Sequence, residues 1–172
     1  CDWSSDVCSS DLVRALDEIV WAVNPKSDTL DHIAAYLIHH TEEFLESTGI
    51  RYRLAVPVEL PAIFVAADVR HHLFLAFTES LTNAARHSGA TEIAVSLKFD
   101  APLLTLSVRD NGHGFAPEIA ISGDGLRNMR DRLAQIGGQC DVTTRPDAGT
   151  DVVFRLNLEH AKIAAAQPAA AA

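Results

Sequence analysis

Apolar residues recur at the three-to-four-residue spacing of an amphipathic helix in the first half of the chain. The pattern covers residues 13–23, 29–48 and 67–88. Gly49 and Gly89 directly follow the second and third stretches, and glycine is the residue that most often ends a helix. We therefore predict three helices in this half of the chain.

Alternation of apolar and polar residues, the pattern of a strand with one buried face, dominates the second half. One predicted strand, residues 50–56, lies in the first half. The others cover residues 92–99, 103–109, 139–144 and 151–158, and one further helix is predicted over residues 125–136. Strands of this kind are typical of a mostly antiparallel sheet that helices cover on one side. The prediction is an α+β fold, a two-layer α/β sandwich with a mixed, mostly antiparallel sheet covered by helices on one face.

Composition adds the expectation of one main domain, because the 172 residues, 48% of them hydrophobic, suffice for a single core. The net charge of -9 makes nucleic acid an unfavourable direct partner. No apolar run reaches the roughly 18 residues that a membrane-spanning helix needs. Three scattered cysteines indicate neither a disulfide framework nor a metal cluster. We expect a cytoplasmic segment, although a longer protein that contains it could be anchored in a membrane.

The two ends of the chain differ in character from the rest. Residues 1–12, CDWSSDVCSSDL, lack periodicity and resemble the translation of a sequencing-library adapter, so we expect an artefact there and a natural protein that continues upstream of Val13. A genuine serine-rich flexible leader is the alternative. Residues 159–172 are rich in alanine and offer no periodic face, which predicts disorder.

The polar side of the long helix carries the first candidate chemistry. His72, Glu79, Asn83, Arg86 and His87 form one stripe, in which Glu79, Asn83 and His87 are each four residues apart and therefore lie along one line. The stripe offers a carboxylate, an amide, a guanidinium and imidazoles together. Taken alone, the helix favours the simpler interpretation of a solvated polar face.

Two pairs of glycines follow. Gly112 and Gly114 lie in DNGHGF, where Asp110 ends a predicted strand. Gly123 and Gly125 come directly before a predicted helix, whose first backbone amides could bind phosphate oxygens. Each pair by itself is compatible with an ordinary turn or loop.

The order and spacing of these motifs resemble a known family. ExxxN on a helix, DxGxG after a strand, GxGL before a helix and a Gly-Thr pair before the last strand are similar to the GHKL, or Bergerat, ATPase fold of histidine kinases, DNA gyrase, Hsp90 and MutL. FTESLTNAARHS, DNGHGF and GDGLRNMRDRLAQIGG look most like the sensor histidine kinases that activate response regulators of the LuxR/NarL type. The resemblance covers about Leu16 to Leu158 and identifies residues 28–158 as an ATP-binding catalytic domain.

The resemblance implies ATP and Mg²⁺ as ligands and assigns roles to residues. Asn83 matches the Mg²⁺ ligand, Asp110 the acceptor for the adenine amino group, and Thr150 a residue that supports the adenine end. Gly112 and Gly114 would let the loop over the nucleotide move. The residues expected near the phosphates are Gly123, Gly125 and Leu126, with Arg86 and His87 as additional contacts. Glu79 would act as a base, or would orient water bound to Mg²⁺.

The acceptor histidine of such a kinase is usually followed by an acidic residue, and none of the eight histidines here is. Residues 13–25 resemble the closing end of the helical dimerisation and phosphoacceptor domain, or form a helix that packs on this domain alone. We expect the acceptor upstream, a homodimer formed by upstream helices, and ATP binding without autophosphorylation.

Three alternatives to a histidine kinase remain open at this point. The same fold could serve an anti-sigma-type serine kinase or an ATP hydrolase, both motivated by Glu79. It could also serve as a non-catalytic nucleotide-binding or protein-interaction module, which the missing acceptor motivates.

Overall fold

The computed structural model describes residues 29–115 and 124–159. Its elements are α2 (Leu30–Glu46), β1 (Arg51–Ala55), α3 (Ala67–His87), β2 (Glu92–Asp100), β3 (Leu103–Asp110), α5 (Asp124–Gln135), β4 (Gln139–Thr144) and β5 (Thr150–Asn157). Each helix and strand predicted within the described residues is present, with ends shifted by two residues at most. The helix predicted over 13–23, the N-terminal segment 1–12 and the tail beyond Glu159 lie outside the described residues.

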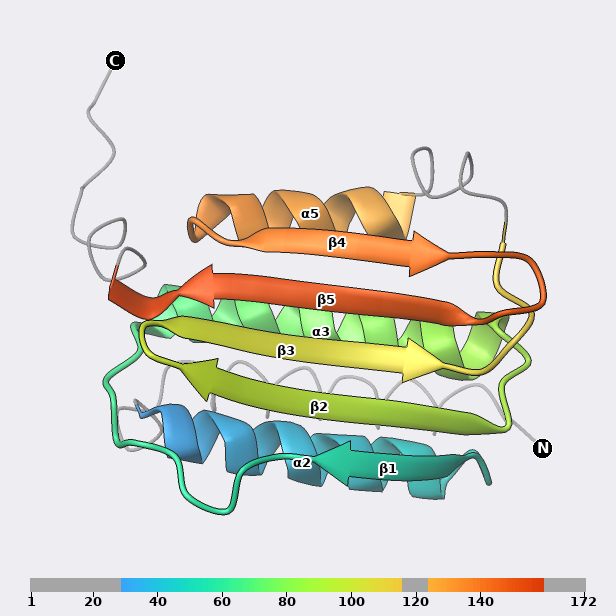
Figure 1. Ribbon diagram of the computed structural model, residues 1–172, viewed down its shortest axis with the longest axis horizontal. Coiled ribbons are helices and arrows are strands. Elements are labelled where there is room, and N and C mark those ends of the chain that lie inside the picture. Colours follow the sequence, from blue (N-terminus) through green and yellow to red (C-terminus); the bar gives the residue numbers. More distant parts are fainter. Residues whose placement is uncertain (1–28, 116–123, 160–172) are drawn as a thin grey trace, which may run out of the picture.

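The strands form one sheet of five in the order β1-β2-β3-β5-β4. β1 runs parallel to β2, whereas every other neighbouring pair is antiparallel. The three described helices lie together behind one face of this sheet (Figure 1). The prediction of a two-layer sandwich with a mixed, mostly antiparallel sheet is confirmed.

β5, the last strand along the chain, lies between β3 and β4 in the sheet (Figure 1). Its first residues therefore pair with the last residues of β3, as the register Arg109↔Asp151 records. Antiparallel pairing thus brings the end of one strand and the start of another, about forty residues apart along the chain, to the same edge of the sheet.

The core lies between the sheet and the helices. Alternate residues of each central strand face the helices, as in the fully alternating burial of β5. From α3 the buried apolar residues include Leu73, Phe74, Phe77 and Leu81. Each such side chain contributes about 1.5–3 kcal/mol on burial.

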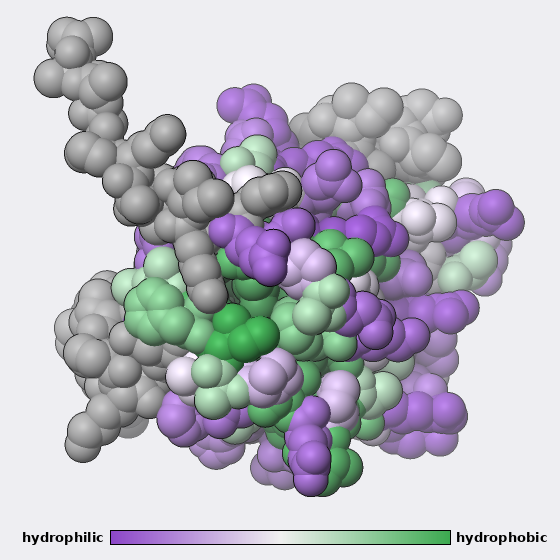
Figure 2. All heavy atoms as spheres, turned by 60° about the vertical axis from the view of Figure 1, so that its left-hand side comes forward, coloured by the Kyte–Doolittle hydropathy of each residue, from purple (hydrophilic) through white to green (hydrophobic). Residues whose placement is uncertain are grey.

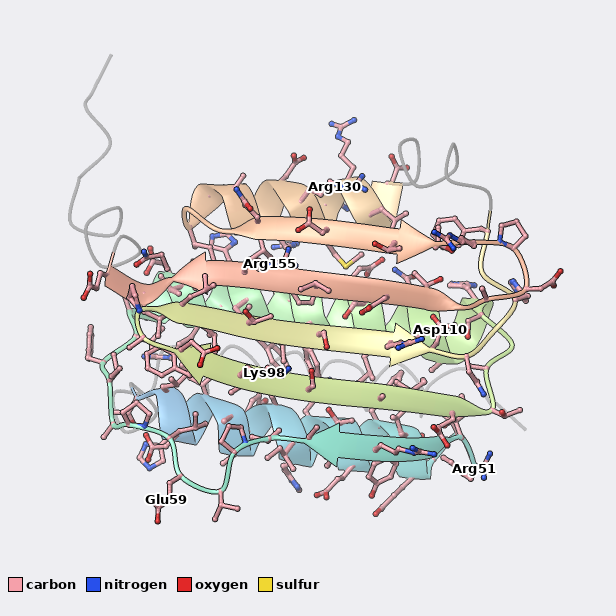
Figure 3. The ribbon with its side chains drawn as sticks, viewed as in Figure 1. Arg51, Glu59, Lys98, Asp110, Arg130 and Arg155 are labelled. Atoms are coloured by element: carbon pink, nitrogen blue, oxygen red, sulfur yellow. The ribbon has the colours of Figure 1, made fainter. Side chains whose placement is uncertain are left out.

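The opposite face of the sheet is polar and open (Figure 3). The hydroxyl groups of Ser96 and Ser107 lie 2.7 Å apart across β2 and β3, and Arg155 forms an ion pair with Asp141 across β5 and β4. No helix covers this face in the described part of the chain (Figure 1). The alternation of the strands therefore sorts polar residues to solvent and apolar residues to the core.

Arg70 on α3 is a buried residue that the apolar pattern did not anticipate. Its side chain is 1% exposed, and its Nη1 donates a hydrogen bond to the carbonyl oxygen of Val65 at 2.9 Å. His72 belongs to the predicted polar stripe, yet its side chain is half-buried, and this burial lowers the pKa of its imidazole. The polar stripe of α3 is therefore not uniformly solvated.

The end of the sheet away from Asp110 carries an apolar patch on its surface (Figure 2). The large apolar side chains with high exposure among residues 29–115 and 124–159 are Val58, Phe64 and Leu103. Leu103 belongs to the β2–β3 hairpin at that end (Figure 1).

Across the same ranges, no helix has the length and apolar character needed to span a bilayer.

Candidate functional site

A pocket of about 240 Å³ opens where α3 ends, β3 ends, α5 begins and β5 begins. Asp110 marks this edge of the sheet in Figure 3. The lining residues are Glu79, Ser80, Asn83, Ala84, His87, Ser88, Val108, Asp110, His113, Gly114, Phe115, Gly125, Leu126, Met129, Thr150 and Val152. Four segments that are distant in the sequence therefore share one cavity, and most of its walls are apolar.

Eight of the residues singled out from the sequence line this pocket: Glu79, Asn83, His87, Asp110, Gly114, Gly125, Leu126 and Thr150. Two others do not. Arg86 is exposed at the end of α3, and Gly112 lies in the loop behind the pocket wall. Gly123 lies outside the described residues.

Glu79 and Asn83 face the pocket from successive turns of α3. The Asn83 amide nitrogen lies 3.4 Å from Oε1 of Glu79 and donates to it. The amide oxygen of Asn83 is then the atom that remains for a ligand, and it suits a hard cation without adding charge. Helical geometry thus places a carboxylate and an amide side by side on one wall.

Asp110 is a buried carboxylate on the opposite wall, and its side chain is 5% exposed. Its Oδ1 accepts a hydrogen bond from the backbone N–H of Gly112 at 2.8 Å. Burial raises the pKa of this carboxyl, while hydrogen bonds from Gly112, Thr150 and Ser88 and the nearby His113 oppose the rise. A carboxylate kept in an apolar pocket is a strong acceptor for a ligand that brings its own N–H donor.

Close backbone packing holds the loop that follows β3. His113 donates its backbone N–H to the Ser88 carbonyl at 2.8 Å and accepts a bond from Asp147 N at 2.6 Å. A Cβ on Gly112 would overlap the carbonyl of Ser88, and one on Gly114 would overlap the carbonyl of Arg145. The mobility that the resemblance implied for these two glycines stays a prediction, whereas the structure gives them a packing role.

Gly114→Ala is expected to destabilise the fold by about 2–5 kcal/mol, because Gly114 has φ +57° and no space for a methyl group. Gly137→Ala is the matched control. Gly137 has φ +72° with nothing within 4 Å of an added Cβ. Alanine there should lower the free energy of unfolding only through backbone strain, by about 1–2 kcal/mol. Urea unfolding of both variants measures the difference, and equal losses would contradict the packing role of Gly114.

The start of α5 closes the pocket on its third side. Gly125 and Leu126 line it, and a Cβ on Gly125 would meet Oε1 of Glu79, so that any larger residue would force the Glu79 side chain to move. The sequence indicated this helix start through its glycines but gave no signal for Met129, whose side chain is fully buried at the pocket. Val108 and Val152, also pocket residues, were identifiable only as inward-facing strand positions.

The charge of the pocket bears on its ligand. Its lining has two carboxylates, from Glu79 and Asp110, and two imidazoles, from His87 and His113, and it includes no lysine or arginine. The described segments hold no group of three or more His, Cys, Asp or Glu residues that could bind a metal unaided. The donor set therefore fits a divalent cation that takes one or two protein oxygens and completes its shell with ligand phosphates and water.

Comparison with known proteins agrees with this geometry. Residues 68–160 match the family described as histidine kinase-, DNA gyrase B-, and HSP90-like ATPase. The chain is 35% identical over 95 residues to the sensor protein VraS of Staphylococcus haemolyticus, covering 55% of this chain and 27% of VraS. It is 31% identical over 162 residues to the sensor histidine kinase LnrJ of Bacillus subtilis, covering 94% of this chain and 40% of LnrJ. The chain thus spans less than half the length of these relatives.

Solved structures share the fold. The histidine kinase domain of the blue-light activated histidine kinase EL346 from Erythrobacter litoralis superposes with a TM-score of 0.67 at 20% identity, over 79% of this chain and 66% of that one. The histidine kinase AdeS of Acinetobacter baumannii gives a TM-score of 0.60 at 16% identity, over 87% of this chain and 78% of that one. At these identities the likeness establishes the fold.

Proposed function

Because the chain belongs to the family of histidine kinase-, DNA gyrase B- and HSP90-like ATPases, we propose that it is the ATP-binding catalytic domain of a two-component sensor histidine kinase. The observation that carries the proposal is the convergence of Asn83, Asp110, Gly125 and Thr150 on one pocket. The similarity to VraS and LnrJ supports the histidine kinase branch of the family.

In the proposed complex, the adenine lies in the apolar part of the pocket near Val108 and Val152, and its amino group donates to Asp110. The phosphates extend toward Asn83 and the start of α5, where backbone amides and His87 can bind their oxygens. Mg²⁺, when bound, would neutralise phosphate charge, with the Asn83 oxygen as ligand and Glu79 acting through water. Arg86 would contact the phosphates from outside the pocket lining.

We further propose that the phosphate acceptor is a histidine of a helical dimerisation domain outside the described residues. In support, none of the eight histidines of the chain is followed by an acidic residue, and the relatives extend well beyond the matched part. The proposed partners are a second copy, joined through those helices, and a response regulator of the LuxR/NarL type. The proposed compartment is the cytoplasm, where ATP is available.

A phosphotransfer assay tests this function. The 172-residue chain is mixed with labelled ATP, Mg²⁺ and a histidine-bearing dimerisation domain from a related kinase. A histidine kinase should label that domain with acid-labile phosphate. Acid-stable phosphate would instead favour a serine kinase, release of inorganic phosphate alone would favour an ATP hydrolase, and ATP binding with no turnover would favour a nucleotide-binding module.

Glu79→Gln is expected to lower the rate of phosphotransfer about tenfold or more, with the affinity for ATP changed about threefold at most, because the amide keeps the shape of the side chain but cannot accept a proton. The two quantities are measured by the same assay and by calorimetry. Glu43→Gln on the exposed side of α2 serves as the control. An unchanged rate of phosphotransfer in Glu79→Gln would contradict a role for Glu79 in the chemical step.

A further inference from the structure

The hydroxyl group of Thr144, at the end of β4, is the centre of a hydrogen-bond cluster behind the pocket wall. Thr144 is 6% exposed and does not line the pocket. Its Oγ1 lies 3.0 Å from the backbone N of Phe115, 3.2 Å from Oγ1 of Thr150, 3.3 Å from the carbonyl of Gly149 and 3.5 Å from the carbonyl of Phe115. One buried side chain thus joins two segments that contribute to the pocket.

We propose that Thr144 is a positioning residue that holds the Thr150 hydroxyl as a hydrogen-bond acceptor toward the pocket, and so sharpens selection of 6-aminopurine over 6-oxopurine nucleotides. The inference rests on the proposed function, in which a nucleotide base occupies this part of the pocket. Thr144 itself would touch no ligand and would act through Thr150.

Counting protons gives the direction of the bond. The Thr144 hydroxyl has one hydrogen and two lone pairs. It accepts from the Phe115 N–H, and its hydrogen is the only one in the contact that can serve the carbonyls of Gly149 and Phe115. Since leaving a buried carbonyl without a donor is costly, the hydrogen goes to the nearer and buried one, that of Gly149. The second lone pair of Thr144 then accepts the hydrogen of Thr150.

The consequence for the pocket is that Thr150 turns its lone pairs toward the ligand. Thr150 and Asp110 both line the pocket, and each lies next to a residue of the pair Arg109↔Asp151 that joins β3 to β5. Two acceptors therefore lie next to each other. A 6-amino group has two hydrogens to donate to such a site, whereas a 6-oxopurine brings a third acceptor and only the N1–H as donor, which leaves a buried acceptor unpaired.

Main-chain contacts hold the backbone around the cluster in place. Asp147 N donates to His113 O at 2.6 Å, which ties the β4–β5 turn to the loop after β3. Gly149 packs so closely on the carbonyl of Asp110 that a Cβ would overlap it. Both segments that Thr144 joins are therefore held by main-chain contacts as well.

The test measures affinities for non-hydrolysable analogues of ATP and of inosine triphosphate (ITP), which has a 6-oxo group, in the 172-residue chain. Thr144→Val removes the hydroxyl, which frees the Thr150 hydrogen to donate toward the pocket. The preference for the ATP analogue is expected to fall about tenfold. Thr144→Ser should restore it to within about twofold, because serine keeps the hydroxyl. Thr143→Val, the exposed neighbour on β4, should leave it unchanged.

A double-mutant cycle separates positioning from general destabilisation. In a Thr150→Val background, Thr144→Val should change the preference no further, because no hydroxyl remains to be oriented. Parallel loss of both affinities in Thr144→Val, or no recovery in Thr144→Ser, would overturn the inference while leaving ATP binding by the unaltered chain intact. Failure of the unaltered chain to bind ATP would instead refute the proposed function. If Thr144→Val does not fold, Thr144→Ala is measured in its place and is held to the same outcomes.

Discussion

Asp110→Ala is expected to weaken binding of a non-hydrolysable ATP analogue by about 100-fold or more. Asp110 is 5% exposed in the pocket, so alanine removes the acceptor and leaves the proposed adenine amino group buried without a partner. Calorimetric titration measures the loss. Asp100→Ala, an exposed position at the far end of β2, is the control and should bind normally. Unchanged affinity in Asp110→Ala would contradict the proposed position of the adenine.

Asp110→Asn separates binding from stability. Asparagine keeps the bond from Gly112 N–H but carries no charge, so it should lose most of the affinity and still fold. Burial raises the pKa of Asp110, and a raised pKa means that the folded state loses stability as pH rises above the usual aspartate value of 3.8 and through the folded value. Asp110→Asn has no such loss. Its free energy of unfolding, measured in urea between pH 4 and 7, should therefore increase relative to that of the unaltered chain as the pH rises.

Asn83→Ala is expected to abolish the dependence of nucleotide affinity on Mg²⁺ and to lower phosphotransfer by about 100-fold or more. Asn83 offers its amide oxygen to the pocket from α3. The pocket lining has no lysine or arginine, so no side chain there could replace the cation in offsetting phosphate charge. Titrations with and without Mg²⁺ measure the first effect, and the phosphotransfer assay measures the second.

The control for Asn83→Ala is Asn128→Ala, an exposed asparagine on α5. It tests whether loss of any amide near the site has the same effect. An Mg²⁺ dependence that persists in Asn83→Ala would show that the cation, if it binds, is held by other groups.

Much of the fold could be predicted because each strand alternates. The inward residues of β5, for example, are buried one after another, as the period of two requires. The order of the strands could not be predicted in this way. Alternation indicates which face of a strand is buried but not which strands are its neighbours. The parallel pairing of β1 with β2 and the place of β5 between β3 and β4 could therefore not be predicted from it.

The site was predictable where a motif marked it, as at Asn83, Asp110 and Gly125, all of which line the pocket. Arg86 illustrates the limit. It lies on the same predicted stripe as Asn83 but is exposed and does not line the pocket. Thr144 illustrates another limit, since its role depends on hydrogen bonds to residues 115 and 150 that only the folded chain brings together.

The position of β5 has a consequence for folding during synthesis on the ribosome. During synthesis, residues 83 and 110 leave the ribosome before residue 150, and the place between β3 and β4 stays empty until β5 has been synthesised. The pocket lacks Thr150 and Val152 until β5 has joined the sheet. A nucleotide that needs the complete pocket should therefore stabilise the domain only after β5 has been synthesised.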